Sequence, residues 1–192
     1  RSFPPKFRNK ILKPVKMGYT VMQGKQDLLD DFYLLYSRRM LEKGSPPLGK
    51  KFFQNIINYY EYGEVEITMV YDVEKPIATG FSLSYMGFNE ICWASSDLSY
   101  NKYNINSFLY WNVIMSSITK NFRYFSMGRS TKNSNNHFYK KQWNPIEHPI
   151  FYNYSEPVGK SLKDLTYLTK IWKHQPLSTS VYFGHILSKY IY

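Results

Sequence analysis

The sequence predicts an α/β (α+β) fold, with a mixed, mostly antiparallel central sheet flanked by helices. Two segments with apolar residues at helical spacing precede three segments in which apolar and polar residues alternate, as in a strand meander. An apolar helix and a short strand follow, which is the pattern of a crossover packed against a sheet. The 192 residues, with 19 Tyr, 13 Phe and 4 Trp, suffice for one domain with a substantial core.

The N-terminal 26 residues differ from the rest of the chain. Residues 1–26 are basic and interrupted by three prolines. We expect a short basic helix over 7–16 and a strand over 19–22, in a connector from an upstream region. The start at Arg1, without an initiator Met, suggests that the chain begins inside a longer protein. The domain itself is then expected to span 27–192.

Two helices are expected before the sheet. Asp27 is the predicted N-cap of the first helix, over 28–42, and Gly44 is its predicted end because glycine adopts the left-handed conformation easily. The second helix is expected over 49–60, after a loop that Pro46 and Pro47 enforce.

The meander and the later elements follow from the same periodicities. Strands of the meander are expected at 65–71, 76–85 and 90–95. A polar loop over 128–136 leads to a basic segment that ends at Trp143. Helices are expected at 106–120, 162–173 and 179–191, and strands at 123–127 and 150–154.

Charge and cysteine content narrow the partners and the compartment. Lys and Arg number 25 against 14 Asp and Glu, and this net charge of +11 favours nucleic acid, sugar nucleotides or anionic lipid head groups as partners. The single cysteine, Cys92, excludes an internal disulfide and indicates a buried thiol in a reducing, cytoplasmic compartment. No apolar stretch approaches the ~20 residues of a transmembrane helix, so membrane contact is expected only at the inner face.

Several kinds of catalytic site are absent from the sequence. Neither GxxxxGK[ST] nor GxGxxG occurs, which argues against kinases, ATPases and dehydrogenases. No GxSxG elbow supports a hydrolase. The histidines lack the spacing of metal ligands, and no metal site is expected at His137, His148, His174 or His185.

The strongest candidate site combines two short segments, GRST at 128–131 and YKKQW at 139–143. A glycine and an arginine after a strand, followed by lysines, place donors and positive charge at the rim of a cleft, as an anionic substrate or an oxyanion requires. Alternatively, the lysines form a solvated face and Arg129 is a surface ion-pair partner. Trp143 is either a stacking surface or core. The basic stripe around Arg8 fits phosphate contacts or a solvated connector.

These motifs, in this order, resemble those of the FemAB-like family, most closely its exopolysaccharide-associated branch. The resemblance rests on FSMGRS at 125–130, KKQW at 140–143, LYW at 109–111 and IWKHQPL at 171–177, and it covers nearly the whole chain. It implies a GNAT-like acyltransferase fold. Full-length members pair two such domains, and this chain resembles the C-terminal one.

The resemblance also implies an activity, the transfer of an acyl or aminoacyl group to an amine on a cell-wall or polysaccharide precursor. The family's lysine corresponds to Lys140, which would stabilise an oxyanion or a phosphate. The donor would be aminoacyl-tRNA or acyl-CoA, with no tightly bound cofactor and no metal. The partners would be an anionic small molecule or a glycan or peptidoglycan-type precursor, tRNA, and a peripheral membrane surface. The residues expected to bind substrate are Gly128, Arg129, Ser130, Tyr139, Lys141, Trp143 and Arg8.

Departures from the family pattern leave alternatives open. Ser126 stands where the family has Asp, and Asn135 and Asn144 stand where it has glycines. The lost carboxylate motivates the hypothesis of an inactive scaffold, and only Asp97 and Glu147 are candidates for a general base, by position alone. The segment before the 106–120 helix lacks the Gly-rich turn that binds pyrophosphate, which argues against conventional CoA binding. The main alternative function is a non-catalytic basic module that binds RNA or an anionic glycan.

Overall fold

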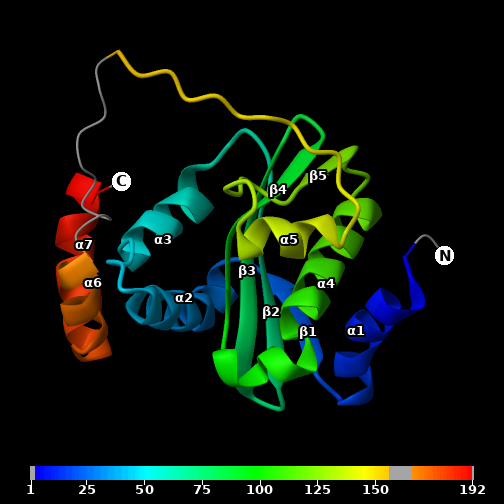
Figure 1. Ribbon diagram of the computed structural model, residues 1–192, viewed down its shortest axis with the longest axis horizontal. Coiled ribbons are helices and arrows are strands. Elements are labelled where there is room, and N and C mark those ends of the chain that lie inside the picture. Colours follow the sequence, from blue (N-terminus) through cyan, green and yellow to red (C-terminus); the bar gives the residue numbers. More distant parts are fainter. Residues whose placement is uncertain (1–2, 156–165, 192) are drawn as a thin grey trace.

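The computed structural model describes residues 3–155 and 166–191 and contains a five-stranded sheet in the order β1-β2-β3-β4-β5 (Figure 1). Neighbouring strands are antiparallel except β4 and β5, which run parallel. The strands are β1 (Thr20–Gly24), β2 (Val65–Asp72), β3 (Lys75–Tyr85), β4 (Phe88–Ser96) and β5 (Tyr124–Ser126). The helices are α1 (Pro5–Lys16), α2 (Leu29–Lys43), α3 (Lys50–Tyr59), α4 (Ile105–Thr119), α5 (Asn135–Lys141), α6 (Thr166–Lys173) and α7 (Leu177–Ile191), with 3₁₀ turns η1 (Gln26–Leu28) and η2 (Leu98–Tyr103).

Helices cover both faces of the sheet because the central strands are apolar on both sides. On one face, Phe32 of α2 and Phe53 of α3 pack on Phe81 of β3, with ring centroids 4.9–5.5 Å apart. On the other face, α4 packs on buried residues of β2, β3 and β4 that include Val70 and Ile77. The crossover from β4 through α4 to the parallel strand β5 confirms the predicted fold class.

The N-terminal helix α1 packs against α4 on the outside of the domain (Figure 1). Phe7 and Ile11 of α1 are buried in a third apolar cluster together with Trp143, which follows α5. The Lys10 ammonium donates a hydrogen bond to the Gln142 side-chain oxygen at 2.7 Å, which joins α1 to the end of α5. The predicted basic helix therefore exists and buries one face.

The C-terminal helices α6 and α7 pack against α2, far along the chain from it. Gly44 ends α2 with φ 75°, as predicted, and lies against Thr169 of α6. After a turn at 142–144, residues 145–155 run as a long irregular segment, the strap, from α5 over the molecule (Figure 1). The first residues of the helix predicted at 162–173 lie outside the described residues.

Two predictions about local structure are wrong. Residues 150–154 form no strand, since β5 is the last strand of the sheet and these aromatic side chains are exposed along the strap. Asp27 does not cap α2, because the 3₁₀ turn η1 precedes that helix and the Asp27 carboxylate instead accepts a hydrogen bond from the Lys25 backbone N–H.

Candidate active site

Strand β4 continues beyond its parallel partner. Residues 88–90 pair with β5, whereas within the described chain residues 91–96 find strand partners only in β3. The chain leaves the sheet after Ser126 and turns at Gly128, whose φ of 67° lies in the left-handed region. One edge of β4 is therefore left unpaired, and such an edge can hydrogen-bond an extended ligand. We call the gap between residues 91–96 and the chain after β5 the β4–β5 fork.

A β-bulge lies in β4 just past this divergence. The pairing of β4 with β3 shifts between Ile91 and Trp93, so that Cys92 has no partner in β3. Bulges bend a strand and are frequent beside active sites. Burial raises the pKa of the Cys92 thiol to about 11, so the thiol stays protonated at neutral pH and is a poor nucleophile.

Lys140 lies beside the fork, and its ammonium is held by the backbone. Its side chain projects from α5, is 8% exposed, and donates hydrogen bonds to the carbonyl oxygens of Gly128 and Arg129 at 3.0 and 2.9 Å. Burial lowers the pKa of Lys140, an effect that the nearby Glu90 carboxylate opposes. Next to these carbonyls, the Ser130 hydroxyl is buried and has no hydrogen-bond partner in the described structure. Buried hydroxyls usually have a hydrogen-bond partner, so this unpaired hydroxyl is an exception beside the Lys140 site.

A carboxylate that the sequence did not reveal lies at the same fork. Glu90 of β4 is opposite Ser126 of β5, and the Ser126 hydroxyl donates to Glu90 Oε2 at 2.7 Å. Of the sequence-based candidates for a general base, Asp97 is bound to Ser99 and Lys75, and Glu147 lies by His137. The pairing of β4 with β5 brings Glu90 to the fork, and this register cannot be deduced from the sequence.

The other predicted site residues are more scattered. The Arg129 guanidinium is exposed and donates to the Tyr152 hydroxyl of the strap at 2.8 Å. Lys141 is exposed, 3.4 Å from the Glu147 carboxylate. Arg8 lies on the exposed face of α1.

Tyr139 and Trp143 face the interior. The Tyr139 ring meets Tyr110 of α4 edge-on with centroids 5.7 Å apart, and burial raises the pKa of its hydroxyl. The Trp143 ring is 7% exposed and lies 4.8 Å from the Phe7 ring, so it offers no open face on which a ligand could stack. The structure thus brings the backbone carbonyls of Gly128 and Arg129, next to Ser130, to the Lys140 ammonium, whereas the Arg129 side chain binds Tyr152. Tyr139 and Trp143 are used for packing.

The connection from β4 to α4 differs from an anion-binding loop. It forms the 3₁₀ turn η2, and the Asp97 side chain accepts a hydrogen bond from the Ser99 backbone N–H at 3.0 Å. Burial raises the pKa of Asp97, but the hydrogen bond from the Ser99 hydroxyl and the Lys75 ammonium, 2.9 Å away, outweigh it and hold this pKa below its usual range, so the group is ionised at neutral pH. A resident carboxylate therefore satisfies an amide that a phosphate-binding loop would leave free.

The described residues contain neither a metal-binding cluster nor a membrane-spanning helix. Residues 3–155 and 166–191 contain no cluster of three or more His, Cys, Asp or Glu side chains that could hold a metal ion. In the same two stretches, no helix combines the length and the apolar character needed to cross a membrane.

The strand order, the helices on both faces and the single parallel pair with its fork define an acyltransferase domain. Residues 6–141 match the family model for the acetyltransferase (GNAT) domain, and the chain therefore belongs to this family. The GNAT-like part of the predicted resemblance is confirmed, whereas the FemAB-like branch stays a prediction. No curated protein sequence matches the chain.

Solved structures share this fold at low sequence identity. FemX matches at 12% identity with a TM-score of 0.59 over 73% of this chain and 53% of its own. L-PGS from Bacillus licheniformis matches at 14% identity with a TM-score of 0.59, over 74% of this chain and 51% of its own. A third match is the aminoglycoside acetyltransferase meta-AAC0020, from an uncultured soil metagenomic sample and in complex with sisomicin. It has 11% identity and a TM-score of 0.58, over 74% of this chain and 99% of its own. The match thus spans about half of FemX and L-PGS and nearly all of the meta-AAC0020 chain.

Proposed function

We propose that this domain is an N-acyltransferase that joins an acyl or aminoacyl group to an amine at the β4–β5 fork. The observation that carries the proposal is the Lys140 ammonium, held beside the fork by the carbonyls of Gly128 and Arg129. An ammonium group has three N–H donors. Two of them have acceptors in the described structure, and the third is available to a substrate oxygen.

The chemistry needs a positive donor at this place. Attack of an amine on an ester or thioester forms a C–N bond and moves an electron pair onto the carbonyl oxygen. The C–O or C–S bond then breaks, the alcohol or thiol leaves, and the nitrogen releases a proton. In this proposal Lys140 donates to the oxyanion, and Glu90 accepts the proton, directly or through a water molecule.

For the acceptor we propose an amine on a cell-wall or polysaccharide precursor, as the FemAB-like resemblance implies. The net charge of +11 favours an anionic precursor. For the donor, the carboxylate-capped turn at Asp97 favours aminoacyl-tRNA over acyl-CoA, since a negative group already accepts the Ser99 N–H where a pyrophosphate would bind.

The test is a transfer assay with both donors and a panel of amine acceptors. We expect Lys140→Met to lower kcat by about 100-fold or more, because loss of one preorganised oxyanion donor costs this much. Lys51→Met is the matched control, because Lys51 is an exposed lysine of α3 outside the segment 128–140 that holds the Lys140 ammonium, and its variant should transfer at the wild-type rate. Circular dichroism and thermal unfolding establish that each variant is folded.

Two results would contradict the proposal. A folded Lys140→Met protein that keeps kcat within about threefold of wild type would remove Lys140 from the chemistry. A folded wild-type domain that transfers from neither donor, yet binds RNA or an anionic glycan with an affinity that falls steeply with salt, would be a non-catalytic basic module instead.

A further inference from the structure

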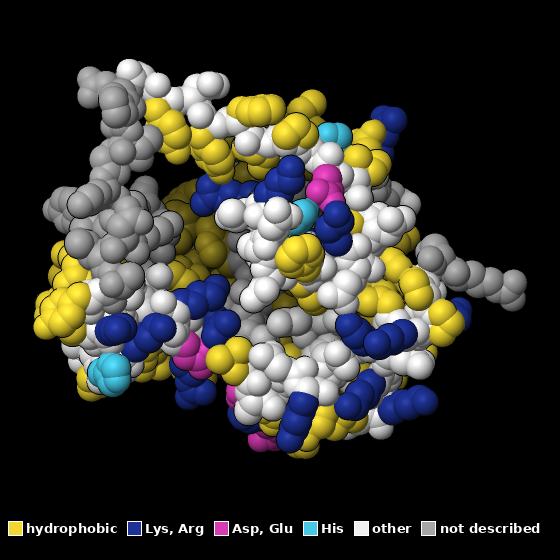
Figure 2. Space-filling model, in the orientation of Figure 1, with side chains coloured by type: hydrophobic (Ala, Val, Ile, Leu, Met, Phe, Trp, Pro, Cys, Tyr) yellow, Lys and Arg dark blue, Asp and Glu magenta, His cyan; other side chains and the backbone are white. Residues whose placement is uncertain are grey.

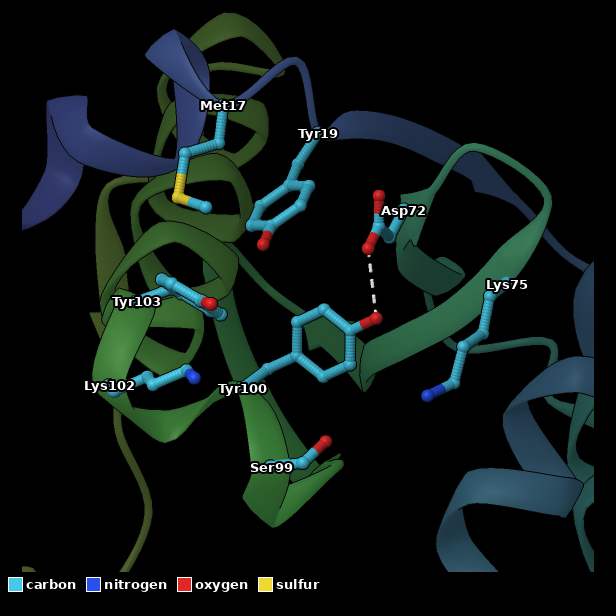
Figure 3. A pocket seen from close by; sticks show the side chains of 8 residues that line it. All are labelled: Met17, Tyr19, Asp72, Lys75, Ser99, Tyr100, Lys102 and Tyr103. Carbon is cyan, nitrogen blue, oxygen red and sulfur yellow. Dashed lines mark hydrogen bonds between the residues drawn. The ribbon is translucent and has the colours of Figure 1, made fainter.

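A second pocket, of about 430 Å³, opens where the β2–β3 turn, the segment after α1 and the η2 turn meet (Figure 3). It shares no residue with the Lys140 site. Its walls combine three tyrosine rings, two lysines and a carboxylate. These six residues are Tyr19, Tyr100, Tyr103, Lys75, Lys102 and Asp72.

The tyrosines form one aromatic cluster. The Tyr19, Tyr100 and Tyr103 ring centroids are 6.0–6.4 Å apart in each pairing. The Tyr100 hydroxyl donates to Asp72 at 2.8 Å, which fixes the central ring, whereas the Tyr19 and Tyr103 hydroxyls point toward the open space beside it (Figure 3). Aromatic side chains of this kind can stack with any nucleic-acid base, because every base has a π face.

Two cations beside the cluster have no acidic partner. Lys102 Nζ lies 4.9 Å from the Tyr103 ring centroid, and Lys13 Nζ of α1 lies 5.4 Å from the same centroid. Lys13 also donates to the Lys102 carbonyl oxygen at 3.2 Å, which ties α1 to η2. Across residues 3–155 and 166–191, neither lysine forms an ion pair with Asp or Glu, whereas Lys75 on the other side of Tyr100 pairs with Asp97.

Lysines and arginines gather around this part of the surface. Figure 2 shows Lys and Arg side chains over α1 and the adjoining lower part of the molecule, with few acidic side chains among them. An anion approaching this face therefore meets several cations. Three of them lie over the aromatic walls: Lys75 is 4.8 Å from the Tyr100 ring centroid, and Lys102 and Lys13 are 4.9 and 5.4 Å from that of Tyr103. Of these three, only Lys75 has an acidic partner among the described residues.

We propose that this pocket binds a nucleotide, with the base against Tyr100 and Tyr103 and the phosphate on Lys13 and Lys102. The aromatic walls distinguish this site from a simple phosphate site, and the unpaired lysines distinguish it from an apolar aromatic site. Asp72 keeps acceptor capacity for a base amino group or a ribose hydroxyl. The proposal does not depend on the proposed acyl transfer.

Titration calorimetry at fixed salt tests the site with AMP and UMP, compared with adenosine, uridine and inorganic phosphate. We expect both nucleotides to bind at least about fivefold more tightly than their nucleosides and than phosphate, since stacking and charge act together. Lys102→Ala should weaken AMP binding by about fivefold or more. The matched control, Lys51→Ala on α3, should leave the Kd unchanged.

A second pair of variants tests the aromatic wall. Tyr103→Leu removes the ring and should weaken AMP by at least about fivefold, whereas Tyr103→Phe keeps the stacking face and should bind within about twofold of wild type. A short single-stranded RNA that binds about tenfold more tightly than AMP would identify an RNA strand as the source of the nucleotide, and equal affinities would identify a free nucleotide.

Either of two outcomes would overturn the proposal. One is phosphate binding as tightly as AMP, which would make this an anion site without base recognition. The other is unchanged AMP affinity in Lys102→Ala, a variant of an exposed side chain whose fold is not at risk.

Discussion

Ser126 and Glu90 face each other across the parallel strands β5 and β4, and the Ser126 hydroxyl donates to Glu90 Oε2 at 2.7 Å. The same hydroxyl accepts a hydrogen bond from the Gly128 N–H at 3.1 Å. Ser126 therefore links a carboxylate of one strand to the turn whose carbonyl holds Lys140. The FemAB-like pattern has Asp at position 126, whereas here the neighbouring strand supplies a carboxylate to the same place.

This relationship predicts that restoring the family's residue is harmful. In Ser126→Asp two carboxylates would face each other across the strand pair, and the donor to Glu90 would be lost. We expect the free energy of unfolding to fall by about 1 kcal/mol at neutral pH, and less at high salt, because both groups are partly exposed. Urea unfolding at low and high salt measures this, and transfer activity should not rise.

Ser126→Asn is the matched control, since it has nearly the same size without the charge. It should lose less stability than Ser126→Asp and show no salt dependence. Adding Glu90→Gln to Ser126→Asp should recover most of the loss, because it removes the repulsion. Unchanged stability together with raised activity in Ser126→Asp would show that the Glu90 carboxylate does not replace the missing one.

Much of the fold could be predicted because periodicity and turn residues are local signals. The alternation in 65–71 and the glycine at position 44 gave β2 and the end of α2 nearly to the residue. The strand expected at 150–154 fails for a non-local reason, since aromatic residues form a strand only where the tertiary structure places them beside a strand edge, and these residues lie exposed and unpaired instead. Asp27 fails because its carboxylate is used by a turn of its own.

The candidate site could be predicted only in part. Gly128, Arg129 and Lys140 are close in sequence, and one turn and one short helix bring the Lys140 ammonium to the carbonyls of the other two, so their contact could be expected from the sequence. Glu90 is 36 positions from Ser126, and only the strand register joins them. Trp143 is adjacent in sequence to the lysines, but its burial depends on α1, more than a hundred residues earlier.

Trp143 is predicted to be an anchor for α1. Trp143→Ala should lower the free energy of unfolding by about 3 kcal/mol, because it opens a cavity against Phe7 and Ile11. Urea unfolding measures the loss. Limited trypsin digestion should then cleave α1 after Arg8 or Lys10 faster than in the wild type.

Phe138→Ala is the control for this prediction, because Phe138 is an aromatic residue of α5 that is 54% exposed. It should change the free energy of unfolding by about 0.5 kcal/mol or less. Wild-type stability and wild-type trypsin resistance in Trp143→Ala, combined with weaker binding of an anionic glycan, would indicate a ligand-stacking role for Trp143 instead.

Tyr110 is predicted to make the domain sensitive to alkaline pH. Burial raises the pKa of Tyr110 from 10.0 to about 12, so between these values the folded protein keeps a proton that the unfolded chain releases. The contribution of Tyr110 to the free energy of unfolding is therefore fully present below pH 10 and is lost as the pH rises toward 12, by at most about 1.4 kcal/mol per pH unit. The fall in free energy of unfolding between pH 9 and pH 11 should be about 1 kcal/mol smaller in Tyr110→Phe than in the wild type. Tyr59→Phe is the control, because Tyr59 is 73% exposed, and its free energy of unfolding should fall with pH as in the wild type. If Tyr110→Phe also falls as the wild type does, the Tyr110 hydroxyl is not protected from ionisation in the folded protein.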